Sequence, residues 1–203
     1  MDDLALLDAW RDGDEDAGSA LLRRQFDALY RFFRSKVPED AVGELIQQTL
    51  FTCVEKREQF RGDAQFSTYV FAIARRAAIA FYRGRQREAA IDPGATSIED
   101  LARSPSGVLM EREQDRLLLR GLRRIPIDHQ ILLELHYWER LPGPELAEIL
   151  EVPEGTVRTR LRRAKELLRE AIEQVADDRA LAKSTVDDLA AWAESLRDRL
   201  GRT

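Results

Sequence analysis

Apolar residues recur at three- and four-residue spacing over most of this 203-residue chain. That spacing is typical of helices that bury one face, and no segment alternates apolar and polar residues as a half-buried strand does. Pro38 and the turn Arg61-Gly62-Asp63 provide stops between helices. We therefore expect an all-α protein without a sheet. Helices are predicted near residues 4–10, 17–37, 40–59, 66–83, 117–125, 129–139, 145–150 and 154–171.

Residues 84–106 depart from this helical pattern. They read GRQREAAIDPGATSIEDLARSPS, and their Gly, Pro and Ser residues are typical of a linker. We expect a flexible linker with one helical turn at Ile98–Ala102, which joins two small helical domains. The predicted organisation is a first domain at 1–83, the linker at 84–106, a second domain at 107–171, and a C-terminal helical extension at 172–203.

Composition excludes several classes of function. No stretch approaches the ~20 apolar residues of a membrane span, and the acidic start Met1-Asp2-Asp3 lacks the order of a signal peptide. The single cysteine, Cys53, cannot form an internal disulfide, so we expect a cytoplasmic protein without membrane insertion. Because only two histidines accompany that cysteine, we expect no metal site and no cofactor. No phosphate loop or activated nucleophile is present, so we expect no enzyme.

The remaining questions about Cys53 and the histidines concern packing. Cys53 falls on the inward side of its predicted helix, which favours a core residue over a redox sensor. His129 and His136 are seven residues apart on one predicted helix, and packing or capping explains them better than a ligand role.

Basic residues are concentrated in two short segments of an acidic protein. The net charge is −5, yet residues 61–87 hold six basic residues and one acidic residue, and residues 156–169 hold the same numbers. Of the 32 basic residues, 28 are arginine, which suits bidentate contacts to phosphates and bases. We therefore expect DNA to be bound locally, by two separate elements.

The second basic segment lies in a predicted helix-turn-helix. Leu146 and Leu150 face inward from the first helix, and Ala147 is small where two helices must cross closely. Glu151 occupies a turn position that favours Gly or Asn, so we expect backbone strain or a shifted turn there. An ordinary helical hairpin with a solvated basic face is the alternative. The side chains left outside on the second helix, as candidates for reading DNA, are Thr156, Arg158, Thr159, Arg162 and Arg163.

The first basic segment interleaves arginines with aromatic residues. Six of the chain's fifteen aromatic residues lie in 60–83. Aromatic rings beside arginines hold unstacked bases of single-stranded DNA. On a helical wheel Phe66, Phe71 and Phe81 fit a core role, whereas an exposed strip consists of Gln65, Tyr69, Arg76 and Arg83. The helix before it carries a strip of Glu44, Gln48 and Glu55, which fits either a partner helix or a solvated face.

These features together resemble the extracytoplasmic-function (ECF) sigma factors of the bacterial sigma-70 family. The stretch GELIQQTLFTCVEKREQFRGDAQFSTYVFAIAR resembles that family's region 2, and LPGPELAEILEVPEGTVRTRLRRAKELL resembles its region 4. The resemblance covers roughly residues 4–170. It implies two helical domains and a function in transcription initiation.

The resemblance also implies partners and roles. It implies that core RNA polymerase binds through its β′ clamp coiled coil and its β subunit, and it leaves open whether an anti-sigma factor binds. The implied polymerase-binding residues are Glu44, Leu45, Gln47 and Gln48. Those implied for the single-stranded −10 element are Phe60, Arg61, Gln65, Tyr69, Arg76 and Arg83. The helix matching 154–165 is implied to read the −35 element as duplex DNA.

This chain departs from the family pattern at several of these positions. Tyr69 stands where the family commonly has Trp, Arg76 where it has Asn, and Gln48 where it has an acid. The departures affect the expected −10 sequence preference more than the mode of binding.

Two other functions remain open from sequence. A regulator that binds duplex DNA without polymerase needs only the second domain, and a helical adaptor would need no DNA contact. The C-terminal extension has an apolar face, which fits either packing on the second domain or a regulatory cover.

Overall fold

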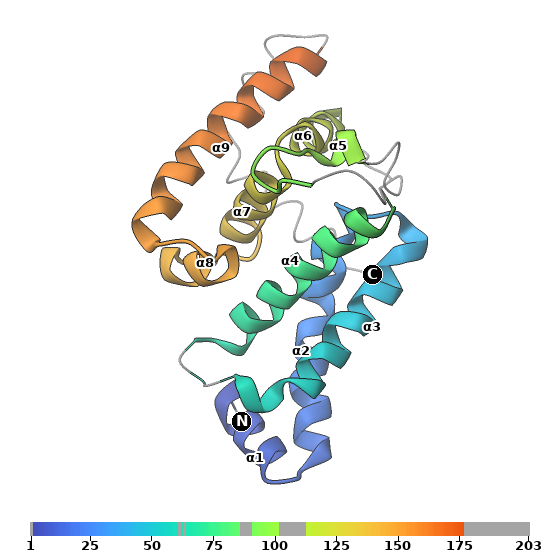
Figure 1. Ribbon diagram of the computed structural model, residues 1–203, viewed down its shortest axis with the longest axis vertical. Coiled ribbons are helices and arrows are strands. Elements are labelled where there is room, and N and C mark those ends of the chain that lie inside the picture. Colours follow the sequence, from blue (N-terminus) through green and yellow to red (C-terminus); the bar gives the residue numbers. More distant parts are fainter. Residues whose placement is uncertain (1, 61, 63, 86–90, 102–112, 177–203) are drawn as a thin grey trace.

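The computed structural model describes residues 2–60, 62, 64–85, 91–101 and 113–176, and this part of the chain is helical (Figure 1). The elements are α1 (Asp3–Arg11), α2 (Glu15–Arg34), α3 (Glu39–Glu55), the 3₁₀ turn η1 (Arg57–Gln59), α4 (Phe66–Arg85), α5 (Ile98–Leu101), α6 (Glu113–Arg124), α7 (Ile127–Tyr137), α8 (Gly143–Leu150) and α9 (Glu154–Val175). Among the described residues the only strand-like pairing is an isolated bridge between Ser97 and Pro126. The expected all-α class is confirmed.

Helices α1–α4, which fall in the predicted first domain, pack together. The Asp14 side chain caps α2, because it accepts hydrogen bonds from the backbone N–H groups of Asp16 and Ala17, both at 3.0 Å. Gly18 lets α1 cross α2 closely, since a Cβ there would lie 2.5 Å from the Trp10 ring. Phe33 and Tyr82 are among the largest fully buried side chains and anchor α2 and α4 in this core.

The third helix is shorter than its sequence pattern predicts. We expected one helix over 40–59, but α3 ends at Glu55 and a 3₁₀ turn follows at 57–59. Lys56 leaves the helical region at φ −107° and ψ 15°, and the four residues that follow Glu55 are all polar, so no apolar side chain holds this turn against the core.

Helices α6–α9, which fall in the predicted second domain, pack together. The α6 and α9 helices cross at Gly121, where a Cβ would lie 2.6 Å from Ile172 Cγ1. α9 continues to Val175, four residues beyond the predicted end. The rest of the predicted C-terminal extension, residues 177–203, lies outside the described residues.

The described part of the predicted linker packs against the second domain. Ile91 and Ile98 are buried, and the predicted helical turn is present as α5. The backbone N–H groups of Ile127 and Asp128 donate to the carbonyls of Thr96 and Pro93, both at 2.9 Å. Residues 91–101 are therefore held at the start of α7, which the composition of the segment does not suggest.

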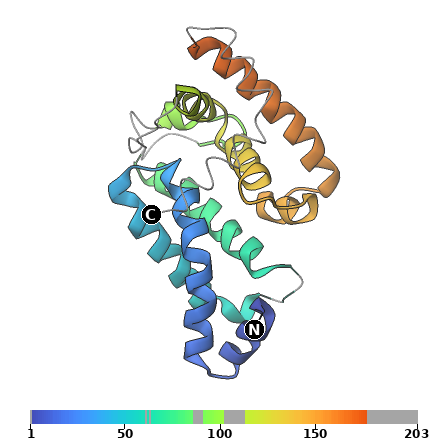
Figure 2. The ribbon, with the colours of Figure 1, turned by 180° about the vertical axis from the view of Figure 1, so that it is seen from behind.

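The two domains share one apolar core in this structure. A continuous buried cluster runs from Leu6 in α1 to Val157 in α9, and α4 lies against α8 (Figures 1 and 2). A second cluster fills the space between α6 and α9. None of the described helices is long and apolar enough to cross a membrane.

Candidate nucleic-acid interface

The turn of the helix-turn-helix adopts the strained conformation that its sequence predicts. Glu151 ends α8 with φ 58° and ψ 44°, in the left-handed region that favours glycine. The N–H groups of Glu151 and Val152 close the turn on the carbonyls of Glu148 and Ala147, at 3.2 and 3.0 Å. Ala147 is buried at the crossing, as expected. The short turn therefore forms without glycine.

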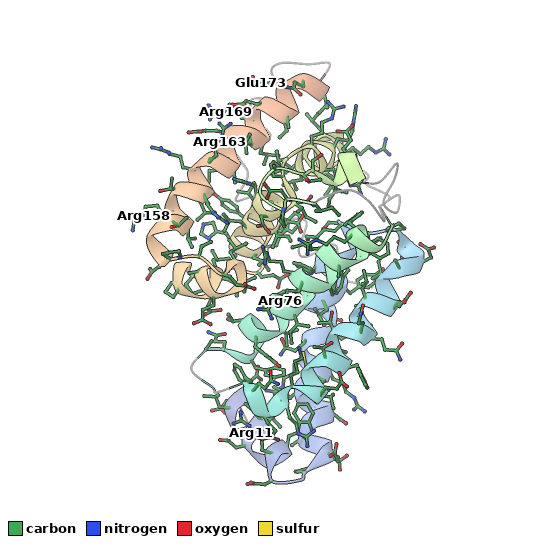
Figure 3. All side chains as sticks on the ribbon, in the orientation of Figure 1. Arg11, Arg76, Arg158, Arg163, Arg169 and Glu173 are labelled. Carbon is green, nitrogen blue, oxygen red and sulfur yellow. The ribbon has the colours of Figure 1, made fainter. Side chains whose placement is uncertain are left out.

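The outer face of α9 is exposed and basic. Val157 is buried and Leu161 is half-buried, so the helix presents its arginines to solvent, as Figure 3 shows for Arg158 and Arg163. Arg162 lies 3.9 Å from Glu166, and Arg163 lies 3.4 Å from Glu166 and 3.6 Å from Glu170. Pairs as exposed as these contribute little stability and exchange readily for a phosphate. Four of the five predicted residues, Arg158, Thr159, Arg162 and Arg163, are exposed, and Thr156 is half-buried.

A shallow groove of about 300 Å³ runs between α3 and α4. Its lining combines amides, a ring and cations, which are the groups that hold an unstacked base. Of the predicted residues it contains Tyr69 and Arg76, and also Gln48 from the predicted polymerase surface. Thr52, Lys56 and Gln59 complete its polar lining, and sequence analysis did not single them out.

Tyr69 is positioned by an aromatic cluster. Its ring stacks on Phe60 with centroids 5.0 Å apart, and Phe60 meets Phe66 edge-on at 5.7 Å. The Tyr69 hydroxyl donates to the Lys56 carbonyl at 3.2 Å. Burial raises the pKa of this phenol, which keeps it neutral at physiological pH. Phe60 is only 6% exposed, so in this structure it supports Tyr69 and offers no free face to a base.

Gln65 and Arg83, which were also predicted for the single strand, do not line this groove. Gln65 is exposed just before α4, and Arg83 donates to the Ile91 carbonyl at 3.4 Å. Arg76 pairs with Glu151 of the second domain at 2.8 Å. Arg61 lies outside the described residues. Phe66 and Phe71 are buried as the core interpretation predicts, and Phe81 is half-buried.

The predicted polymerase surface lies on the outer face of α3. Glu44, Gln47 and Gln48 are exposed, whereas Leu45 is buried and packs inward. Sequence analysis missed Phe51, which lies on the same face, one turn beyond Gln47 and Gln48, and is 60% exposed. Its signal in the sequence was an aromatic residue at an outward position of the helix.

The remaining candidate residues are Cys53, His129 and His136. Cys53 is fully buried, and burial raises the pKa of its thiol to about 12, so it does not form the reactive thiolate of a redox sensor. His129 and His136 are not part of any group of three or more possible metal ligands among the described residues.

Comparison with known families decides between the open interpretations. Residues 20–88 match the family model for sigma-70 region 2, and residues 115–168 match the model for sigma-70 region 4. The two matches occur in that order and together cover more than half of the chain. The chain belongs to the sigma-70 family. Its helix-turn-helix is therefore the region 4 of a sigma factor, and the groove between α3 and α4 lies in region 2.

Named relatives of this sigma factor are ECF RNA polymerase sigma-E factors. It is 24% identical over 183 residues to the ECF RNA polymerase sigma-E factor of Haemophilus influenzae, a match that covers 85% of this chain and 96% of that protein. The corresponding factor of Escherichia coli K12 is 25% identical over 178 residues, which covers 83% and 93% of the two chains.

Solved structures share the fold. CnrH, solved in complex with the cytosolic domain of CnrY, aligns with a TM-score of 0.62 and 21% identity, covering 86% of this chain and 99% of CnrH. RpoE from Bartonella quintana, solved with the anti-sigma factor NepR, aligns with a TM-score of 0.58 and 22% identity, covering 78% and 98%.

Proposed function

We propose that this sigma factor binds core RNA polymerase in the cytoplasm, directs it to promoters with −35 and −10 elements, and helps to open the duplex. It acts by binding and catalyses no reaction. The observation that carries the proposal is the pair of DNA-suited surfaces on two domains: the exposed arginines of α9 on a helix-turn-helix, and the groove between α3 and α4 that combines Tyr69 with Arg76.

At the −35 element α9 enters the major groove. Arginine side chains near the N-terminal half of a recognition helix reach the O6 and N7 acceptors of guanine, while neighbouring cations contact phosphates. Arg158 and Thr159 lie nearest the helix start, and Arg162 and Arg163 follow one turn later. The first pair is thus placed for base edges, and the second for bases or backbone.

At the −10 element the groove between α3 and α4 takes up unpaired bases. A base stacked on an aromatic ring gains about 1–3 kcal/mol, which offsets part of the cost of unpairing. Tyr69 provides the ring, Gln48 and Gln59 provide amides that can read a base edge, and Arg76 with Lys56 provides charge for the strand. Capture of the unpaired strand makes opening favourable at this place.

The outer face of α3 docks on the polymerase clamp. Glu44, Gln47 and Gln48 supply polar contacts around the exposed Phe51 ring, an arrangement of a polar rim around an aromatic anchor that is typical of binding hot spots.

We further propose an anti-sigma factor as a partner. RpoE, whose fold this chain shares, was solved with NepR, which is named as an anti-sigma factor, and CnrH was solved with the cytosolic domain of CnrY.

The decisive experiment separates this function from a duplex-binding regulator and from an adaptor. Purified protein and core polymerase are combined on a library of genomic fragments, and run-off transcripts are sequenced. Arg158→Ala with Arg163→Ala should reduce transcription at least tenfold, because loss of two contacts of about 1–3 kcal/mol each weakens promoter binding. Arg23→Ala, at an exposed arginine on α2 outside both surfaces, should leave transcription unchanged.

The two alternatives predict different results in the same assay. A regulator would bind specific duplex DNA tightly without polymerase. An adaptor would be indifferent to the double substitution on α9.

A further inference from the structure

The groove between α3 and α4 is lined in part by the turn that follows α3, residues 56–60, which we call the groove turn. Lys56 and Gln59 line the groove from this turn, and the Tyr69 hydroxyl donates to the Lys56 carbonyl at 3.2 Å. Phe60 ends the turn, and its ring stacks on that of Tyr69. The position of the groove turn therefore determines both a rim of the groove and the place of its aromatic ring.

The groove turn has few contacts of its own. Apart from Phe60 it contains no apolar side chain that could pack on the core. Its backbone closes through two hydrogen bonds, from the Gln59 N–H to the Lys56 carbonyl at 2.9 Å and from the Phe60 N–H to the Arg57 carbonyl at 3.3 Å. Among the described residues, no backbone N–H donates to the Phe60 carbonyl. Side chains from elsewhere in the chain are therefore needed to fix the turn.

The last turn of α1 supplies two such side chains. Arg11 Nη2 donates to the Phe60 carbonyl. The Arg57 guanidinium lies over the Trp10 ring, with Cζ 5.6 Å from the ring centroid. Figures 1 and 2 show α1 beside the chain that leaves α3, and Figure 3 shows Arg11 on this helix. Helix α1 thus holds the groove turn at its middle and at its end.

Both α1 side chains are themselves held in place. Trp10 is buried, and the missing side chain of Gly18 makes room for its ring. Arg11 donates through Nη1 to Asp8 at 3.4 Å, and its side chain is 25% exposed. A guanidinium is planar and always charged, so contacts from two of its nitrogens hold its plane. Because charge-assisted hydrogen bonds are stronger than neutral ones, Arg11 gives the Phe60 carbonyl a defined position.

The Phe60 ring links this position to Tyr69. The two rings stack with centroids 5.0 Å apart and 30° between their planes. Phe60 is buried in a closely packed core, so its ring moves with its backbone and not independently of it. One face of the Tyr69 ring is covered by Phe60, and the ring lines the groove with its remaining surface. A shift of the groove turn would therefore tilt the surface on which a base stacks.

We propose that Arg11 is a positioning residue for promoter opening: through the carbonyl and the ring of Phe60 it fixes the plane of Tyr69, on which an unpaired base stacks. Arg11 does not itself line the groove, and it precedes residues 20–88, which match the region 2 model. The proposal rests on the proposed function, in which this groove takes up unpaired bases.

The test compares Arg11→Gln with Arg24→Gln in holoenzymes assembled from core polymerase and the full-length protein. Arg24 pairs with Asp3 of α1 at 2.7 Å, so its exchange removes another arginine contact to the same helix and leaves the groove turn intact. Each holoenzyme transcribes a promoter recovered from the library of genomic fragments. The promoter is used in two forms, one fully paired and one with its −10 element unpaired by mismatches.

Arg11→Gln should lower transcription from the paired promoter about fivefold, because a displaced ring offsets less of the cost of unpairing. On the promoter with an unpaired −10 element it should act like the wild type, because no base pair has to open there. Arg24→Gln should act like the wild type on both forms.

A double substitution measures whether Arg11 acts through Tyr69. Tyr69→Ala should lower transcription from the paired promoter, and adding Arg11→Gln should lower it no further, because the effects of two residues that act through one contact do not add. Hydrogen exchange on the full-length protein measures the groove turn directly. Arg11→Gln should speed exchange of the Gln59 and Phe60 N–H groups, and Arg24→Gln should not.

Equal transcription by the Arg11→Gln and Arg24→Gln holoenzymes from the paired promoter would overturn this inference and leave the proposed function intact. An equal loss on both promoter forms, or a further loss when Arg11→Gln is added to Tyr69→Ala, would reduce Arg11 to a general stabilising role. Unchanged exchange at Gln59 and Phe60 would show that the groove turn does not depend on Arg11. If the wild-type holoenzyme transcribes no fragment of the library, the proposed function fails and this inference fails with it.

Discussion

When a partner covers an aromatic ring that is exposed to water, the free energy falls. The Phe51 ring on α3 is 60% exposed. The neighbouring side chains on that face are polar and surround it. Glu151 is the second informative residue. Its φ of 58° lies in the left-handed region, where a residue with a side chain is strained and a glycine is not. Both residues depart from what packing or turn geometry alone would favour: Phe51 lies on the proposed polymerase surface, and Glu151 pairs with Arg76 of α4.

Phe51→Ala should weaken the affinity for core polymerase by about tenfold or more, since truncation of an aromatic anchor at an interface centre typically costs ~2 kcal/mol. Leu4→Ala removes an apolar side chain that is 50% exposed on α1 and should leave the affinity unchanged. Competition with a labelled sigma factor for core polymerase measures both. Equal affinities for the two variants would remove Phe51 from the docking surface.

His129 should make the second domain less stable in mild acid. Burial lowers its pKa, with Arg160 and Arg163 of α9 lowering it further and Asp128 raising it. A pKa lowered in the folded state means that the unfolded chain takes up the proton first, so stability is lost as pH falls below ~6.5. Urea unfolding at pH 7.5 and 5.5 should show a smaller loss for His129→Gln than for the wild type. An identical loss would contradict this role.

At the scale of elements, helical periodicity predicts where helices exist because one buried face repeats every three to four residues. It placed α2, α4, α8 and α9, and it identified the inward residues of the helix-turn-helix. It does not show which helices cross closely, because a crossing depends on two distant positions at once. Gly121 was not singled out for this reason, although its missing Cβ is what admits Ile172.

Gly121→Ala should destabilise the protein by about 1–3 kcal/mol, because the added methyl group overpacks the α6–α9 crossing. Gly43→Ala is the matched control: a Cβ there meets nothing within 4 Å, and the exchange should stabilise α3 by about 0.5–1 kcal/mol. Chemical denaturation measures both changes. A stabilisation of similar size in both variants would show that helix propensity, not the crossing, decides the effect.

For the whole molecule, sequence analysis predicted two helical domains and two basic surfaces, but not their relative placement. In the sequence, arginines of α2 and α4 that face water, DNA or the acids in and just after α7 cannot be told apart. Only the tertiary structure shows that Arg31 and Arg75 pair with Glu139 and Asp128. The linker was likewise expected to be flexible, because the glycines and prolines in its sequence do not reveal that Ile91 and Ile98 are buried.

The central claim is that one chain contacts a promoter at two separated points while bound to core polymerase. Run-off transcription on a library of genomic fragments, with purified core polymerase and this protein, tests it most directly. We predict start sites that depend on the added protein and that share two sequence elements, one near −35 and one near −10. Transcripts that do not depend on the protein, or start sites that share neither element, would contradict the account.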